Sequence, residues 1–477
     1  MARGTSIVIM CVVLICGVVG TRAVADTTAA ADVRAARGLR SFSLFSSSNS
    51  SKKACVKPKP TLILISGLGG SQMVGTFEGN AECKAMLNTT VVWYADRWYW
   101  DKQLPCWGYL LSLNYNATTK SWSNSTGTKL WPDDGKFLGD VPDGSKQRLF
   151  YWFLNKHLAS THGYTIGKDL FLIPYDWRTG IQGLEQRGGI EGITRRISEA
   201  VKRNCGQKAI VIAHSYGANV MATIFQKPEL QKWRQDTVKA TIYVGAPFGG
   251  CAATTWLNQL SGDFFKLLPV LTNLMPASLT GKFHPTVVGT SVYRMAFGLP
   301  TWGWMLPRPS VLGKDHVVVV TPTKNYTVEQ QKQLLLDMGD EGGASLLDDS
   351  WARSEALLKR GPVAGLETFC LYGTGVPTST TLVFNESIPK RAVINRPFSV
   401  KNVDGDGVVD LTSLRLCSKL APKANIAEVS STYVDHATIL AHPMGLERLS
   451  EILVKLGAGY SSTWNKLLTH AAAWATP

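Results

Sequence analysis

The sequence has no run of five or more basic residues, no paired Cys-x-x-Cys motif and no basic zipper, although 50 Lys and Arg face only 35 Asp and Glu. Proteins that read nucleic acid concentrate their positive charge in such features, so we expect no nucleic-acid partner. The net charge of +15 is spread thinly along the chain. A diffuse surplus of this kind favours an extended anionic partner such as a phospholipid surface.

Long apolar runs are also lacking. The N-terminal apolar stretch at residues 6–20 is shorter than the roughly 20 residues of a typical membrane-spanning helix. It follows Arg3 and precedes Ala23-Val24-Ala25, an order typical of a cleaved signal peptide. We predict a signal peptide over residues 1–25, with an uncleaved anchor as the alternative. The protein is then secreted, or retained in a lysosomal or other vesicular lumen of the secretory pathway.

Cysteine is scarce, with nine residues in the chain, two of them within the predicted signal peptide. The number that remains is odd, so at least one cysteine is a free thiol or pairs with another chain. The secretory pathway permits disulfides among the others.

Sequons of the Asn-x-Ser/Thr type predict N-glycosylation. They begin at Asn49, Asn88, Asn116, Asn124, Asn325 and Asn385.

Apolar runs of strand length alternate with runs of helical period. Residues 61–66 are apolar and β-branched and end in a Gly-rich turn at residues 67–70, which predicts a buried strand and a tight turn. Further strands are predicted at residues 209–214, 240–247, 368–373 and 426–430, and helices at 190–203, 218–225 and 446–456. This alternation predicts an α/β fold with a mostly parallel sheet and helices on both faces.

The same patterns divide the chain into segments. An Ala- and Ser-rich stretch predicts a flexible leader, a Trp- and Tyr-rich stretch and a Pro- and Trp-punctuated stretch look like insertions, and a short tail ends the chain. We expect the leader at residues 26–58, the sheet domain at 59–250 and 366–460, the Trp-rich insertion at 74–135, a cap at 251–365 and the tail at 461–477.

The string Ala213-His214-Ser215-Tyr216-Gly217 lies between a predicted strand and a predicted helix. This is the context of the nucleophile elbow of α/β-hydrolases, in which small residues two positions either side of the serine permit a tight, strained turn. Alanine stands at the first of these positions, where glycine is usual. The pattern predicts that Ser215 is a catalytic nucleophile.

A serine hydroxyl needs a histidine base that is oriented by a carboxylate, and in this fold the chain order is Ser, acid, His. His436 follows the last predicted strand and precedes the closing helix, so we predict it as the base. The acid is expected in the Gly-rich segment 402–410. Spacing does not choose among Asp404, Asp406 and Asp410.

The segment 402–410 also imitates a calcium-binding loop, but Ser413 stands where the bidentate Glu belongs and no helix pair flanks it. We therefore expect no metal, and the chemistry requires no organic cofactor. An acyl-transfer intermediate needs backbone N–H donors for its oxyanion. The residue after the nucleophile, Tyr216, and Leu68 in the early Gly-rich turn are the predicted donors.

Eight sequence strings follow one another along the chain. They are LISGLGGSQM, FLIPYDWR, AHSYGAN, VGAPFGG, TPTKNYT, CLYGTGVPT, DGDGVV and DHATIL. PYDWR and CLYGTGVPT are the two that are most specific to a protein family. From about Pro60 to Leu456 the chain resembles the lecithin:cholesterol acyltransferase family, and within it the lysosomal phospholipase A type.

The resemblance implies Ser215 as nucleophile, Asp406 as acid and His436 as base, with Leu68 and Tyr216 as oxyanion donors. It also implies two disulfides, which join Cys83 to Cys106 and Cys370 to Cys417. The Trp-rich insertion looks like the family's membrane-binding region, and the segment 251–365 looks like its cap and lid. Amphipathic Trp and Tyr side chains do settle at bilayer interfaces, although plain core packing is the alternative for them.

We thus expect a glycosylated serine phospholipase A and O-acyltransferase. It docks on a phospholipid membrane or lipid-particle surface, takes a fatty acyl group onto Ser215, and passes that group to water, a sterol or another lipid alcohol. One alternative is a dedicated phosphatidylcholine-sterol O-acyltransferase. The other is a catalytically inactive lipid-binding protein on the same scaffold.

Overall fold

The computed structural model describes residues 59–79, 87–93, 106, 108–133, 148–261, 293–394 and 397–459. The predicted signal peptide, leader and tail lie outside these residues, as do Asn49, Cys55 and Cys83. No helix in the described ranges is long and apolar enough to cross a membrane.

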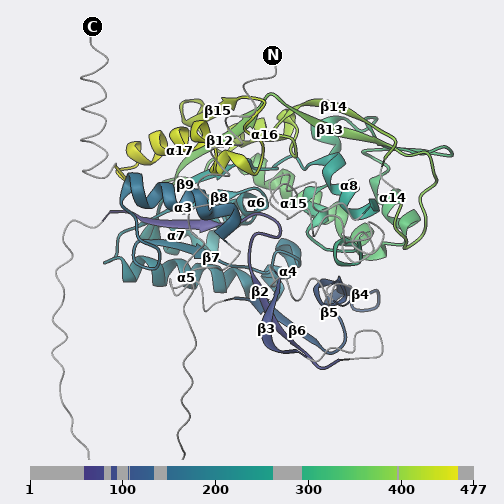
Figure 1. Ribbon diagram of the computed structural model, residues 1–477, viewed down its shortest axis with the longest axis horizontal. Coiled ribbons are helices and arrows are strands. Elements are labelled where there is room, and N and C mark those ends of the chain that lie inside the picture. The colour runs from purple at the N-terminus through teal and green to yellow at the C-terminus, as the bar shows by residue number, and fades with distance from the viewer. Residues whose placement is uncertain are drawn as a thin grey trace, which may run out of the picture. The chain divides into compact units, whose positions relative to one another are not determined.

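A six-stranded sheet forms the centre of the fold, in the order β15-β12-β9-β8-β1-β7 (Figure 1). Every neighbouring pair is parallel. The strands are β1 (Thr61–Ile65), β7 (Leu170–Ile173), β8 (Ala209–His214), β9 (Val238–Val244), β12 (Glu367–Thr374) and β15 (Ile426–Ser430). A parallel sheet with helices along the connections is the predicted α/β-hydrolase architecture, so the fold class is confirmed.

Helices cover both faces of this sheet because side chains of each strand alternate between two apolar clusters. Ile63 and Val211 join the cluster formed with α5 (Gly189–Arg203) and α6 (Tyr216–Gln226). Leu62 and Ile210 join the cluster formed with α3 (Arg148–His162) and α17 (Pro443–Lys455). In Figure 1, α17 and α5 lie on opposite sides of the central strands.

A second sheet of four strands, in the order β11-β10-β13-β14, stands beside the central one (Figure 1). Its strands are β10 (Val317–Val320), β11 (Asn325–Thr327), β13 (Val376–Val383) and β14 (Ser399–Gly405), and the nearby helices are α8 (Ala252–Ser261), α14 (Gln331–Met338) and α15 (Glu341–Arg360). Except for β14, these elements share an apolar cluster of their own around Trp256 and Leu335. The sheet thus joins strands of the predicted cap to strands of the segment 366–460.

The predicted Trp-rich insertion contains two small antiparallel sheets, β3-β2-β6 and β4-β5. Their strands are β2 (Met73–Phe77), β3 (Leu87–Trp93), β6 (Thr128–Pro132), β4 (Leu113–Asn116) and β5 (Ser121–Asn124). Trp93 is buried against Trp177, with ring centroids 5.0 Å apart, whereas Trp131 is 38% exposed. Trp93 therefore packs in the core rather than on a surface that could face lipid.

The described chain also contains shorter elements. The helices are α4 (Gly180–Gln186), α7 (Gln231–Thr237), α12 (Trp302–Met305), α13 (Pro309–Leu312) and α16 (Leu411–Arg415), and the 3-10 turns are η1 (Pro228–Leu230), η3 (Leu416–Lys419), η4 (Lys423–Asn425) and η5 (Thr438–Leu440).

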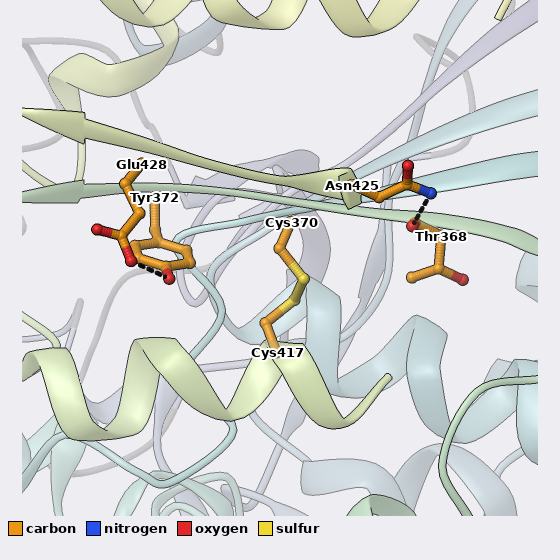
Figure 2. Close-up of a disulfide and its surroundings, with 6 residues drawn as sticks. All are labelled: Thr368, Cys370, Tyr372, Cys417, Asn425 and Glu428. Atoms are coloured by element: carbon orange, nitrogen blue, oxygen red, sulfur yellow. Dashed lines mark hydrogen bonds between the residues drawn. A yellow bond between two sulfur atoms is a disulfide. The ribbon is translucent and has the colours of Figure 1, made fainter. Parts of the chain in front are cut away.

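A disulfide joins Cys370 on β12 to Cys417 on η3, the pairing that the family resemblance implied (Figure 2). It closes a loop with a sequence separation of 47 residues. In the chain-entropy account, such a closure stabilises the fold by about 4 kcal/mol. Beside it, the Tyr372 hydroxyl donates to Glu428 at 2.6 Å and ties β12 to β15 (Figure 2).

The other described cysteines differ in state. Cys106 and Cys205 are disulfide-bonded, and Cys251 is a buried free thiol. The expected pairing of Cys83 with Cys106 stays a prediction because Cys83 lies outside the described residues. The free Cys251 agrees with the odd number of cysteines in the predicted mature chain.

The described sequons differ in access. Asn116, Asn325 and Asn385 are exposed, as glycan attachment requires. Asn124 is half-buried, and its amide oxygen accepts a hydrogen bond from Arg178 at 3.0 Å. Asn88 lies on β3. Glycosylation of these residues stays a prediction.

Candidate active site

Ser215 lies between the carboxyl end of β8 and the first residue of α6. Its backbone has φ 55° and ψ −132°, a conformation that L-residues rarely adopt and that costs on the order of 1–3 kcal/mol. The Ser215 N–H donates to the Val244 carbonyl at 2.8 Å, which holds the turn against β9. A Cβ on Gly217 would lie 2.4 Å from the Ser66 carbonyl oxygen, so only glycine fits there.

The structure brings the three predicted residues Ser215, His436 and Asp406 into one hydrogen-bonded chain. His436 Nε2 lies 2.9 Å from Ser215 Oγ, and His436 Nδ1 lies 2.7 Å from Asp406 Oδ2. Because a carboxylate only accepts, His436 Nδ1 donates to it, and Nε2 is then free to accept the serine proton. All three side chains are at most 7% exposed.

Asp406 follows β14 directly and is held by the backbone around it. Its Oδ1 accepts the N–H groups of Val408 at 3.1 Å and Val409 at 2.7 Å. Its own carbonyl accepts the N–H of His436 at 2.8 Å. One carboxylate oxygen is thus fixed by the loop, while the other is presented to the histidine.

The other two candidate acids serve different partners. Asp404 is exposed on β14, and its Oδ1 accepts the Gly375 N–H at 2.6 Å. Asp410 caps α16 by accepting the Ser413 N–H at 3.0 Å. Within the described ranges, no group of three or more His, Cys, Asp or Glu is placed to hold a metal ion.

His436 sits against two residues that sequence reasoning did not single out. Gly245 has φ +55°, and a Cβ there would lie 3.1 Å from His436 Nδ1 and 3.4 Å from Asp406 Oδ2. His214 Nε2 donates to the His436 carbonyl at 2.9 Å. Gly245 is part of the string VGAPFGG, and His214 is part of AHSYG. Only the fold shows that both residues lie against His436.

The pKa values of His436 and His214 are shifted in opposite directions. Burial lowers the pKa of His436, but the charge and hydrogen bond of Asp406 more than offset it, so its pKa is raised above the ordinary imidazole value. Burial, with the nearby His436, lowers the pKa of His214 to about 3. His214 therefore stays neutral and does not repel a proton on His436.

The two predicted oxyanion donors belong to segments that adjoin Ser215. Tyr216 is the next residue, at the start of α6. Leu68 follows Gly67, where an added Cβ would lie only 2.6 Å from Ser215 Cβ. The turn that carries Leu68 therefore passes directly against the serine, as a second donor loop must.

The PYDWR string forms the loop after β7, and sequence reasoning assigned it no task. Arg178 is fully buried, and its guanidinium binds both oxygens of Asp176, at 2.9 and 2.8 Å. Tyr175 and Trp177 point back to the turn at residues 66–71, where they bind Ser66 and Ser71.

Residues 89–348 match the family model described as lecithin:cholesterol acyltransferase. The mouse protein named lysosomal phospholipase A and acyltransferase is 28% identical over 359 residues, which cover 74% of this chain and 79% of the relative. The chicken protein named phosphatidylcholine-sterol acyltransferase is 28% identical over 316 residues, which cover 66% of this chain and 69% of the relative.

Among solved structures, the chain is similar to lipase 1 from Pelosinus fermentans. That match has 13% identity and a TM-score of 0.35, and it covers 84% of this chain and 99% of the lipase.

Proposed function

This chain belongs to the lecithin:cholesterol acyltransferase family, and from that premise we propose that it is a serine phospholipase A and O-acyltransferase. It cleaves a fatty acyl ester of a glycerophospholipid through an acyl-Ser215 intermediate. The observation that carries the proposal is the buried chain of contacts from Ser215 Oγ through His436 to Asp406, with distances of 2.9 and 2.7 Å. The names of the similar mouse and chicken proteins support the phospholipid as acyl donor.

In the first half-reaction, Ser215 Oγ attacks the ester carbonyl while His436 Nε2 takes the hydroxyl proton. Asp406 stabilises the resulting imidazolium. The N–H groups of Leu68 and Tyr216 bind the oxyanion of the tetrahedral intermediate. His436 then gives the proton to the departing lysophospholipid oxygen, which leaves the acyl group on Ser215.

In the second half-reaction, the acceptor replaces the lysophospholipid. His436 removes a proton from water or from the hydroxyl of a sterol or other lipid alcohol, and the acceptor oxygen attacks the acyl carbon. Collapse of the second intermediate returns the proton to Ser215 Oγ. Water gives a free fatty acid, and an alcohol gives a new ester. We propose water as the main acceptor, in the lumen of the secretory pathway or outside the cell.

Product identification tests this proposal. The full chain is incubated with vesicles of acyl-labelled phosphatidylcholine that contain cholesterol and a short-chain alcohol. We expect free fatty acid and lysophospholipid as main products, with some ester of the short alcohol. Cholesteryl ester as the main product would instead identify a dedicated sterol acyltransferase. Folded protein that releases no product would support the inactive lipid binder and contradict the proposal.

The pH dependence follows from the raised pKa of His436. The base works only when neutral, so kcat/KM falls as pH drops through that pKa, which lies above the ordinary value of about 6.5. In the Asp406→Asn variant the raising interaction is lost, and the residual activity should titrate at lower pH. Ester hydrolysis measured from about pH 5 to 9 checks this. An acid limb that stays in place in the variant would contradict the assigned pairing.

A further inference from the structure

The turn at residues 66–71 carries the Leu68 N–H and is rich in glycine, so its own backbone restrains it weakly. Gly69 has φ +70°. A backbone hydrogen bond within the turn, from the Gly70 N–H to the Gly67 carbonyl at 3.0 Å, closes it. Because a peptide unit is planar and trans, this bond directs the Leu68 N–H away from the turn interior.

Three buried aromatic side chains bind this turn from outside, each through its polar atom. The Tyr175 hydroxyl donates to the Ser66 carbonyl at 2.9 Å. The Trp177 indole N–H donates to the Ser71 carbonyl at 3.1 Å, and the Trp93 indole N–H donates to the Gly69 carbonyl. Each of these side chains is at most 3% exposed.

Two serines link the ends of the same turn. Ser66 Oγ and Ser71 Oγ lie 2.9 Å apart, and the Tyr175 backbone N–H donates to Ser71 Oγ at 3.2 Å. With the Gly67 carbonyl bound by Gly70, four carbonyl oxygens of the turn have fixed partners. A rotation of the Gly67–Leu68 peptide would break the bond between the Gly70 N–H and the Gly67 carbonyl in a buried place, where an unpaired polar group is destabilising.

We propose that Tyr175, Trp177 and Trp93 are positioning residues that orient the Leu68 N–H for the oxyanion by fixing the carbonyl oxygens of the 66–71 turn. This inference rests on the proposed function, and it gives the PYDWR motif and one tryptophan of the Trp-rich insertion a task in catalysis. Burial raises the pKa of Tyr175 well above its ordinary value, as do the nearby Tyr216 and Tyr151. The phenol therefore keeps its donor proton at every working pH.

Each variant removes one polar donor and keeps an aromatic ring at the position, which is smaller in the tryptophan variants. Tyr175→Phe loses only an oxygen, whereas Trp93→Phe and Trp177→Phe lose the indole N–H. A misplaced donor affects the transition state more than the bound substrate, and loss of a whole oxyanion donor costs about 10² to 10³ in rate. We expect each single variant to lower kcat about tenfold, and the Tyr175→Phe/Trp93→Phe pair about 100-fold, with KM changed by less than about twofold.

The controls make the same atomic changes away from the turn. Tyr164→Phe removes a hydroxyl that donates to the Pro60 carbonyl at 3.0 Å. Trp233→Phe removes an indole N–H that donates to Ser198 Oγ at 2.9 Å. Both control variants should keep wild-type kcat. Thermal midpoints are measured for every variant, and Tyr175→Phe alone decides if a tryptophan variant does not fold.

The readouts are kcat and KM on a monomeric p-nitrophenyl ester, and affinity for a trifluoromethyl ketone, whose adduct with a serine carries an oxyanion. The affinity of the turn variants for the ketone should fall by the same factor as kcat. Unchanged kcat in Tyr175→Phe, or a fall in kcat with unchanged ketone affinity, would overturn the inference. Wild-type protein that does not cleave the ester would overturn the proposed function instead.

Discussion

Replacing Ser215 by alanine is expected to lower kcat for phospholipid or p-nitrophenyl ester by about 10⁶. The methyl side chain offers no oxygen for attack, and His436 then has no hydroxyl from which to take a proton. The change keeps the Cβ, so the strained backbone at φ 55° is as restrained as before. We expect the thermal midpoint to move little, which separates lost chemistry from lost folding.

A fluorophosphonate probe gives the sharpest readout for Ser215→Ala, because only an activated serine reacts with it. Wild-type protein should be labelled and the variant should not. The matched control is Ser198→Ala, which removes a half-buried hydroxyl that accepts the Trp233 indole N–H. That variant should be labelled and turn over like the wild type. Activity of Ser215→Ala within about 100-fold of wild type would contradict its role as nucleophile.

The second large effect is expected from Asp406→Asn, which should lower kcat by about 10⁴. Asparagine has one acceptor oxygen where aspartate has two. If its NH₂ group faces the imidazole, it donates to Nδ1 and favours the tautomer in which Nε2 carries the proton. That nitrogen then cannot accept the proton of Ser215. The imidazolium formed during attack also loses the charge that stabilises it.

The chain supplies two matched controls for this variant. Asp404→Asn keeps an amide oxygen for the Gly375 N–H, and Asp410→Asn keeps one for the Ser413 N–H, since asparagine caps helices about as well as aspartate. Both variants should retain activity within about threefold of wild type, because neither carboxylate contacts His436. If either of them loses more activity than Asp406→Asn, the acid has been assigned to the wrong residue.

Strongly apolar segments made the central sheet predictable from sequence. The runs at residues 61–66 and 209–214 consist almost wholly of side chains that a parallel strand buries on both faces. The predicted period of the helix at 190–203 appears in the structure as α5, with Ile193 and Ile197 fully buried. Local sequence was sufficient here because the apolar residues of each element show which of its faces is buried.

The four-stranded sheet could not be predicted in the same way. β13 has the sequence VPTSTTLV and β14 has SVKNVDG, which are too polar to stand out as strands. β13 pairs with the distant β10, so its partner is set by the tertiary fold rather than by a neighbouring turn. The strand β14 matters for the site because it ends directly before Asp406.

The site residues were predictable to different degrees. The elbow string predicted Ser215 as the nucleophile. His436 was predicted as the base because it follows the last predicted strand. Three aspartates lie within seven residues, so spacing alone could not identify the catalytic acid. Only the family resemblance selected Asp406. The hydrogen bonds that hold the 66–71 turn come from side chains that are distant in the sequence: Tyr175 lies 109 positions from Ser66, and Trp93 lies 24 positions from Gly69. Contacts at such separations leave no local pattern.

Composition did not decide between lipid contact and core packing for the Trp-rich insertion. The structure decides it for one member, because Trp93 lies in the core and its indole N–H binds the Gly69 carbonyl. A buried tryptophan needs a partner for its N–H, so burial and a polar contact occur together. Among the tryptophans of this insertion that the structure describes, Trp131 is exposed and is available for a lipid surface.

The central claim is that a phospholipid acyl group passes through Ser215. The most direct measurement is rapid quenching of the full chain with acyl-labelled phosphatidylcholine vesicles, followed by mass spectrometry of the peptide that contains Ser215. The account predicts an acyl mass on Ser215 in wild-type protein, none in Ser215→Ala, and release of the adduct when water or an alcohol is allowed to react. Product formed without any adduct on Ser215, or with the acyl group on another residue, would contradict the account.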